Sequence, residues 1–179
     1  MWQLIDERGR QSPDDILAVD EAGRRMTFGE YRTRVQRCAA GLYALGVAPG
    51  DVVSWVLPTW LEATVVAGAL DRLGVTQNPA LHHYRRKELS FIACQASTST
   101  LIVPTSWRGF DYRGLAAEVV ADVRAAQERE LQVIVVDRDQ PVPDADPQIL
   151  PPPPGNAERI AWVMYTSGTT ADPKGVKHR

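Results

Sequence analysis

Short apolar runs alternate with helix-like segments along most of this chain, and that alternation limits the folds open to it. The runs expected to form strands are residues 51–57, 75–78, 100–104 and 133–137. The segments between them repeat apolar residues every three or four positions, which is the spacing of one helix face. Strands separated by helices in this way build a parallel sheet covered on both faces. The sequence therefore predicts an α/β fold, a parallel sheet flanked by helices.

The first long helix is marked by residues at both of its ends. Thr27 and Glu30 have the spacing of a capping box, in which each side chain bonds to the other residue's backbone N–H, so a helix should begin here. Gly46 and the pair Pro49-Gly50 should end it. The residues expected on its inward face are Phe28, Tyr31, Val35, Cys38, Leu42 and Leu45.

Three further helices and a pair of short N-terminal extended segments complete the expected elements. Residues 16–28 should form two short extended segments around a turn. The helix expected over 60–74 is apolar almost all round, so it should be buried on more than one side. Helices expected over 88–96 and 112–129 each have one apolar face. Their inward residues should be Leu89, Ile92 and Ala96, and Tyr112, Leu115, Val119, Val120, Val123 and Ala126.

Residues 141–155 interrupt this pattern with many prolines. Proline is excluded from helix interiors and central strands, so we expect an extended connector on the surface, and a proline-rich partner site is the alternative. After the connector, residues 159–167 resume as an apolar strand that leads into the last segment of the sequence.

Composition places the chain among soluble globular proteins and excludes several function classes. It has 179 residues, enough for one domain with a real core, of which 44% are hydrophobic and 23% charged. A net charge of -2 gives no basic surface for nucleic acid or an anionic membrane. No apolar run approaches the roughly 20 residues of a membrane helix, and the first ten residues are too charged for a secretory signal. Cys38 and Cys94 stand alone, so neither a metal site nor a disulfide is predicted, and we expect a cytoplasmic protein.

The segment from Tyr165 to Arg179 has the chemistry of a phosphate-binding loop. Gly168 and Gly175 let the backbone approach a ligand closely, and Lys174 adds a mobile positive charge. Consecutive backbone N–H groups in such a turn can hold an anion. The spacing is not that of a Walker A loop, no G-x-G-x-x-G is present, and an ordinary polar loop remains the alternative. The hydroxyl residues of the segment are Thr166, Ser167, Thr169 and Thr170.

The string "YTSGTTADPKGVKH" closely resembles the phosphate-binding signature of the adenylate-forming enzymes, which include acyl-CoA synthetases, aryl-acid ligases, adenylation domains and luciferases. In that family the loop contacts the β- and γ-phosphates of ATP. Ala171 departs from the pattern, because the family commonly has glycine there. The resemblance assigns ATP phosphate binding to Thr166, Ser167, Gly168, Thr169, Thr170, Lys174 and Gly175.

Upstream segments extend the resemblance over nearly the whole chain. "MTFGEY" and "ALGVAPGDVVSWVLPTWLEATVVAGALDRLGV" are similar to the opening of an acyl-CoA synthetase. "NPALHHYRRKELSFIACQA" and "VPTSWRGFDYRGL" are more similar to the branch that holds cyclohexanecarboxylate–CoA ligase and dihydroxybenzoate-activating enzymes. The resemblance implies that residues 1–179 are the N-terminal portion of the large domain of an adenylate-forming enzyme, truncated after the phosphate-binding loop, with 141–155 as a connector inside it.

The resemblance implies an ATP-dependent acyl-CoA ligase. A carboxylic acid attacks the α-phosphorus of Mg-ATP to give an acyl-adenylate and pyrophosphate, and the thiol of CoA, the co-substrate, then displaces AMP. Family members carry several further functional parts downstream of this segment. These are the aromatic–Thr–Glu segment, the acidic residue that binds the ribose, most of the acyl pocket, and the C-terminal domain with its lysine. No catalytic residue can therefore be assigned in residues 1–179. We therefore expect no ligase activity from this chain alone.

Several alternatives remain open at this point. The chain could be a truncated product, a pseudogene-like reading frame or one piece of a split gene whose remainder is encoded separately. Its function could be that of a non-catalytic nucleotide- or partner-binding remnant, or of the front part of an adenylation domain that loads a carrier protein. No nucleic acid partner is expected in any of these cases.

Histidines and tryptophans give weaker candidates. His82 and His83 precede three cations and could suggest a metal or phosphate site, but a solvated loop is the preferred interpretation. His178 matches a histidine that often follows Pro-Lys-Gly in the family, although we expect it to be frayed. The tryptophans expected in the core, with a substrate pocket as the alternative, are Trp55, Trp60, Trp107 and Trp162.

Overall fold

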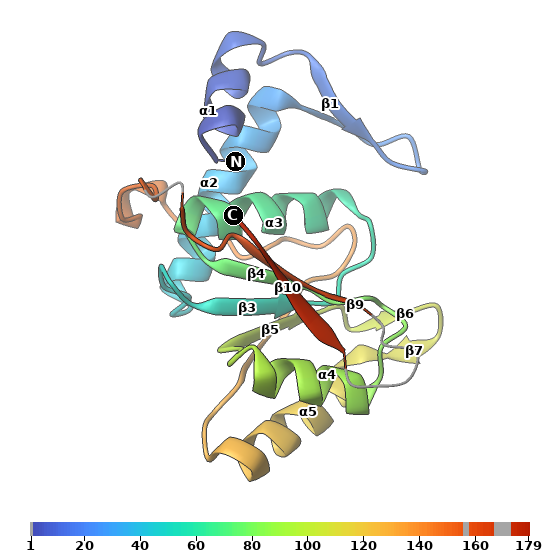
Figure 1. The fold of residues 1–179 in the computed structure, drawn as a ribbon. Coiled ribbons are helices and arrows are strands. Elements are labelled where there is room, and N and C mark those ends of the chain that lie inside the picture. Colours follow the sequence, from blue (N-terminus) through green and yellow to red (C-terminus); the bar gives the residue numbers. More distant parts are fainter. Residues whose placement is uncertain (1, 156–157, 167–172) are drawn as a thin grey trace.

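The computed structural model describes residues 2–155, 158–166 and 173–179 as an α/β unit (Figure 1). Its helices are α1 (Trp2–Gln11), α2 (Phe28–Ala44), α3 (Leu61–Leu73), α4 (Arg86–Gln95), α5 (Tyr112–Gln127) and the 3-10 turn η1 (Pro147–Ile149). Its strands are β1 (Ile16–Val19), β2 (Arg25–Thr27), β3 (Val52–Trp55), β4 (Thr76–Pro79), β5 (Thr100–Val103), β6 (Ser106–Trp107), β7 (Phe110–Asp111), β8 (Gln132–Val135), β9 (Trp162–Thr166) and β10 (Lys174–His178).

Six strands form the central sheet in the order β10-β9-β4-β3-β5-β8. All neighbouring pairs are parallel except β9 and β10, which are antiparallel. The connections α3, α4 and α5 between parallel strands are therefore the crossover helices that such a sheet requires. The predicted fold class, a parallel sheet flanked by helices, is confirmed.

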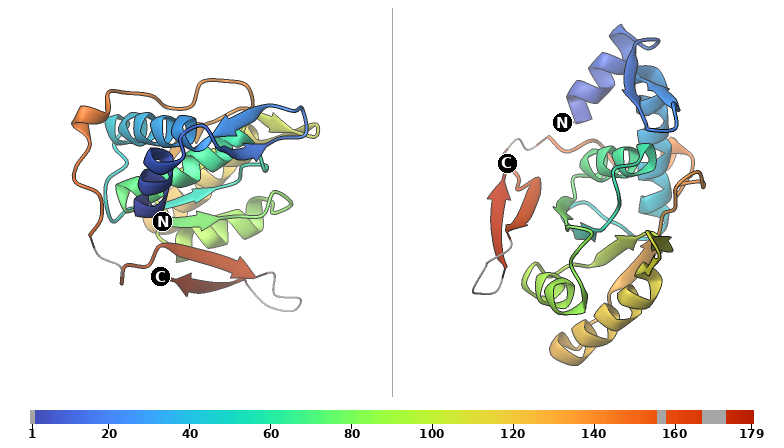
Figure 2. Two further views of the ribbon diagram at one scale, coloured as in Figure 1. Left: turned by 90° about the horizontal axis from the view of Figure 1, so that it is seen from above. Right: turned by 90° about the vertical axis from the view of Figure 1, so that its right-hand side faces the viewer.

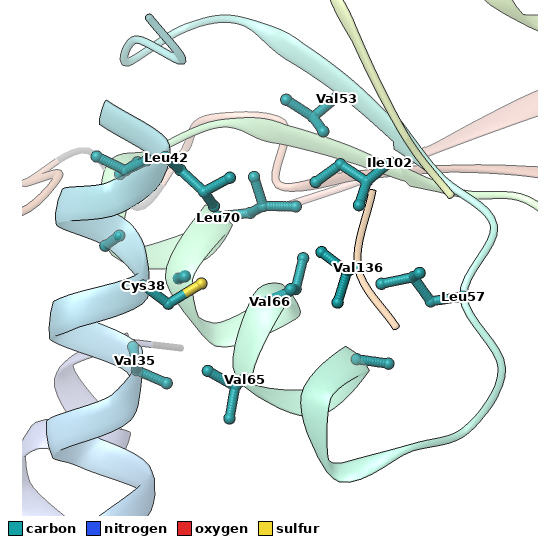
Figure 3. Packing of buried hydrophobic residues seen from close by; sticks show 14 of the residues in the cluster. Val35, Cys38, Leu42, Val53, Leu57, Val65, Val66, Leu70, Ile102 and Val136 are labelled. Carbon is teal, nitrogen blue, oxygen red and sulfur yellow. The ribbon is translucent and has the colours of Figure 1, made fainter. Parts of the chain in front are cut away.

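Helices cover both faces of this sheet (Figure 1). α2 and α3 pack on one face, where Val53 of β3 and Ile102 of β5 belong to the same buried cluster as the side chains of these helices (Figure 3). α4 and α5 pack on the other face, where Leu101 and Val103 of β5 are buried. Successive residues of β5 thus point to opposite faces, and all four are buried, as expected for a central parallel strand.

Local signals in the sequence set the ends of these helices. Thr27 and Glu30 form the predicted capping box at the start of α2, with Glu30 N donating to Thr27 Oγ1 at 3.2 Å and Thr27 N donating to Glu30 Oε2 at 2.8 Å. α3 ends at Gly74, whose φ of 78° is the left-handed conformation that glycine adopts without strain. α3 is buried nearly all round, as predicted.

The proline-rich connector lies against α2 instead of standing free. Arg37 on α2 makes two hydrogen bonds to the carboxylate of Asp144, and Ala145 N donates to Arg37 O at 3.2 Å. Val142 and Leu150 pack against the core on the α2–α3 side. The connector is therefore a docked strap that leads from β8 at one edge of the sheet to β9 near the other (Figure 2).

Some sequence-based expectations differ from the structure in detail. α1, the β6–β7 hairpin and the strand β10 were not predicted. Leu45 and Ala126 were expected to face inward but are exposed, because each lies at the end of its helix, where the packed layer stops. Ala96, also expected to face inward, follows the last residue of α4 and is partly exposed. None of the helices described is both long and apolar enough to cross a membrane.

Candidate phosphate-binding site

The candidate phosphate-binding segment is carried by the hairpin of β9 and β10. The two strands pair in register from Thr166–Lys174 at one end to Trp162–His178 at the other. Thr166 and Lys174, predicted site residues far apart on the loop, are thus brought opposite each other. His178 was expected to be frayed, but it is paired with Trp162. The other predicted site residues, Ser167, Gly168, Thr169 and Thr170, lie outside the described residues.

Gly175 has a packing role that the sequence did not reveal. It pairs with Tyr165, and a Cβ added at Gly175 would lie 3.0 Å from Cζ of the Tyr165 ring and 3.1 Å from Cγ1 of Val163. The ring of Tyr165 is buried in the core on the α4–α5 side. Glycine at this position therefore lets Tyr165 lie across the hairpin and fix its orientation on the sheet.

The base of the hairpin, away from the loop, is firmly attached to the sheet. Gln77 N of β4 donates to Ala161 O at 2.8 Å, and Thr76 Oγ1 donates to Ile160 O at 2.9 Å. Arg159, just before β9, donates to Val75 O at 3.1 Å. These bonds hold the chain where it enters β9.

An ion pair with a buried carboxylate and a partly buried arginine adds to this attachment. The Arg159 guanidinium binds the carboxylate of Asp71 near the end of α3. The same carboxylate accepts a hydrogen bond from Trp2 N at 2.6 Å. Asp71 thus joins α1, α3 and the start of β9 in one place.

A mixed polar and apolar cavity of about 640 Å³ lies beside the hairpin. Its wall includes Lys174, Gly175 and Lys177 of β10, together with Gln95 and Ala96 at the end of α4. Both lysines line this space, but the resemblance assigns phosphate binding to Lys174 and not to Lys177. Lys174 therefore lies both in the wall of this cavity and at the loop end of the hairpin.

A second cavity of about 360 Å³ opens where loops follow β3, β4 and β5. The chain leaves β3 for the α2–α3 face and leaves β4 and β5 for the opposite face, so this is a switch point of the sheet, the usual ligand position in folds of this kind. Its lining includes Thr59, Trp60, His82, Trp107 and Arg108. Arg108 lies over the Trp107 ring, 5.5 Å from its centroid.

The histidine and tryptophan candidates differ in their exposure to solvent. His82 and His83 are exposed, in agreement with a solvated loop, and the described residues contain no group of three or more side chains that could hold a metal. Trp60 is buried, whereas Trp55, Trp107 and Trp162 are partly buried. Three of the tryptophans, Trp55, Trp60 and Trp162, line an apolar cavity of about 340 Å³ beside α3. Trp55 and Trp60 also belong to the hydrophobic core on the α2–α3 side, whereas Trp162 lines the cavity but belongs to neither core cluster of the described residues.

Comparison with known proteins identifies the family. The sequence matches the AMP-binding enzyme family over residues 5–179. The chain belongs to this family. AMP-binding enzymes similar to it include a salicyl-AMP ligase / salicyl-S-ArCP synthetase of Mycobacterium tuberculosis, 33% identical over 96% of this chain and 31% of the relative. Another is a 2-hydroxy-7-methoxy-5-methyl-1-naphthoate–CoA ligase of Streptomyces carzinostaticus, 32% identical over 95% of this chain and 32% of the relative.

Solved structures of AMP-binding enzymes share the fold. A Mycobacterium tuberculosis fatty acyl CoA synthetase superposes with a TM-score of 0.75 at 24% identity, covering 99% of this chain and 34% of that one. The O-succinylbenzoate CoA synthetase of Bacillus subtilis, in complex with AMP, gives 0.72 at 22% identity, covering 99% and 41%. The present chain therefore spans about a third of the length of the curated relatives that it matches.

Proposed function

We propose that this chain supplies the ATP phosphate-binding part of an acid-activating ligase. The observation that carries the proposal is the β9–β10 hairpin, which presents Thr166 and Lys174 opposite each other at the carboxyl edge of a parallel sheet, where ligands of such folds bind. The lysine ammonium is a mobile charge that can follow a phosphate group. The proposed ligands of the β- and γ-phosphates are Thr166, Ser167, Gly168, Thr169, Thr170, Lys174 and Gly175.

The reaction proposed for the whole enzyme is ATP-dependent ligation of a small carboxylic acid to CoA. The acid and ATP form an acyl-adenylate and pyrophosphate, and the thiol of CoA then displaces AMP. Similarity to a naphthoate–CoA ligase supports CoA as acceptor. The similarity to a salicyl-AMP ligase / salicyl-S-ArCP synthetase favours a second candidate, in which a carrier-protein thiol accepts the acyl group.

Magnesium fits this scheme as part of the substrate. No group of three or more histidine, cysteine or acidic side chains is gathered in the part of the chain that the structure describes. We propose that Mg²⁺, which the AMP-binding family implies, arrives bound to the phosphates of ATP. We further propose that residues 1–179 form part of a cytoplasmic AMP-binding domain, with 141–155 as its internal connector, and that they do not form a thioester unaided.

Calorimetry with Mg-ATP tests the phosphate site directly. Lys174→Ala should weaken binding by at least about tenfold, because a charge-assisted hydrogen bond contributes about 1.5–3 kcal/mol. Lys177→Ala is the matched control, since it removes a lysine from the same strand and the same cavity wall. Binding that survives Lys174→Ala, or that both variants lose equally, would refute the assignment.

An activity assay tests the second part of the proposal. The purified 179-residue chain is incubated with Mg-ATP, CoA and a panel of aryl and fatty acids, and thioester formation is followed. We expect no product above the blank without protein. Sustained thioester formation would show that the chain contains a complete active site.

A further inference from the structure

Backbone carbonyls of β9 show how the loop-bearing end of the hairpin is held. The carbonyl of Ala161, just before β9, faces β4, because it accepts the hydrogen bond from Gln77 N. Peptide groups alternate in direction along a strand, so the carbonyls of Val163 and Tyr165 face the same way. In a continuous parallel ladder, N–H groups of β4 and of the residues that follow it would donate to these two carbonyls.

The direction of the N–H groups of β4 also alternates. Thr76 N donates to Asp51 O at 2.8 Å, and Ala80 N donates to Trp55 O at 2.9 Å. Both acceptors belong to β3 or to the residue before it. The even-numbered N–H groups of β4 are therefore directed at β3, and the odd-numbered positions are directed at β9.

Proline occupies the second of these odd-numbered positions. Gln77 provides the first donor to β9, and Pro79, which follows two residues later, has no N–H to offer Val163 O. The registered pairing between β4 and β9 accordingly consists of Gln77 and Trp162 in the ranges described by the structure. The ladder stops before it reaches the end of β9 that carries the loop.

The third carbonyl of β9 that faces β4, Tyr165 O, accepts its hydrogen bond from a tyrosine hydroxyl. Tyr84 Oη donates to Tyr165 O in a long hydrogen bond of 3.4 Å. Tyr84 lies in the segment between β4 and α4, is 4% exposed and packs in the same hydrophobic cluster as Tyr165. Burial raises the pKa of Tyr84, so the hydroxyl keeps its proton and remains a donor.

We propose that Tyr84 is a positioning residue for the phosphate-binding loop. Its hydroxyl holds the loop-bearing end of β9, beyond the point at which Pro79 ends the ladder. The base of the hairpin is held separately, by its bonds to β4 and to the residue before it. The inference rests on the proposed function, because it assumes that the loop binds the phosphates of ATP.

Tyr84→Phe is the variant that tests this role, and Tyr112→Phe is its matched control. Tyr112 is also buried in the α4–α5 cluster, and its hydroxyl also donates to a backbone carbonyl, that of His82, at 2.5 Å. That bond joins the first residue of α5 to the loop after β4 and involves no residue of the hairpin. Both changes remove one hydroxyl and preserve the ring.

Two readouts on the 179-residue chain decide the question. Tyr84→Phe should accelerate amide hydrogen exchange about threefold to tenfold over residues 163–166 without changing it over 159–162, and should weaken Mg-ATP binding by a similar factor. Tyr112→Phe should change neither quantity. Exchange over 163–166 that is unaltered in Tyr84→Phe, or equally accelerated in Tyr112→Phe, would overturn the proposal.

Pro79→Ala provides a test in the opposite direction. Alanine restores an N–H facing Val163 O, so exchange over residues 163–166 should become slower than in the unsubstituted chain. Faster exchange would contradict the inferred end of the ladder. If the unsubstituted chain shows no Mg-ATP binding at all, the phosphate site fails, whereas the exchange comparison still decides whether Tyr84 holds the hairpin.

Discussion

Replacing Asp71 tests whether one buried carboxylate fastens the hairpin to the rest of the molecule. Asp71 is 3% exposed and binds both Trp2 N and the Arg159 guanidinium. Asp71→Ala removes both bonds and leaves a partly buried arginine without its counter-charge. Breaking a buried ion pair in this way costs about 3–5 kcal/mol. Since domains of this size are stable by about 5–15 kcal/mol, the loss is a large fraction of the total.

Asp71→Asn separates the charge from the hydrogen bond. The amide oxygen of asparagine can still accept from Trp2 N, so the expected loss is smaller, about 1–3 kcal/mol. Combining Asp71→Asn with Arg159→Met should cost less than the sum of the two single changes, because either change alone breaks the pair. Asp14→Ala, at an exposed position, serves as the control and should alter stability by no more than about 0.5 kcal/mol.

Urea unfolding followed by circular dichroism measures these differences, and amide exchange over residues 159–162 locates them. The reasoning predicts that Asp71→Ala lowers the unfolding free energy and accelerates exchange at the base of the hairpin. Stability within about 0.5 kcal/mol of the unsubstituted chain would refute it. So would strict additivity of the double variant, since independent residues cannot form the fastening described.

Three further predictions concern parts of the molecule outside the hairpin. A Cβ at Gly41 would overlap the backbone N of Asp144, so Gly41→Ala should lift the connector off α2, cost about 1–3 kcal/mol and expose residues 141–155 to proteolysis. Hydrogen bonding to Arg86 lowers the pKa of Asp122 from 3.8 to about 2, so its stabilising contribution is complete above pH 4 and is lost as pH falls towards 2. Asp122→Asn should therefore flatten the stability profile between pH 4 and 2. Burial raises the pKa of Cys38 to about 12, so its thiol should react with Ellman's reagent at pH 8 only on unfolding, whereas the chain's other cysteine, which is partly exposed, should react in the folded protein.

Elements with a strong local signal were predictable from the sequence. The capping box of Thr27 and Glu30 and the all-round apolar pattern of α3 were both confirmed. Each could be predicted because it depends only on residues that are close together in the sequence. α1 was missed because its stripe of buried residues is thin, namely Trp2, Ile5 and Gly9. It depends on tertiary contact, since a Cβ at Gly9 would lie 2.7 Å from Cβ of Arg32 on α2.

β10 shows a different limit of sequence reasoning. All five of its residues are exposed, so it has no alternation of buried and exposed positions from which a strand can be predicted. It is a strand because β9 pairs with it. In the same way, the positions of Thr166, Lys174 and Gly175 in a candidate site followed from the motif, whereas the packing of Tyr165 on Gly175 and the bond from Tyr84 required the tertiary structure.

The docked connector has a consequence for the order of folding. The four strands β4-β3-β5-β8 and their crossover helices are contiguous in sequence, whereas β9 joins them only after the chain has crossed from β8 to the far side of the sheet. Contacts that close long loops form late, because the loop must lose conformational entropy before the stabilising contacts are gained. The hairpin should thus assemble on a finished layer and come loose before that layer melts. In kinetic terms, the β9–β10 hairpin belongs to the last folding unit of the chain and to the first that opens.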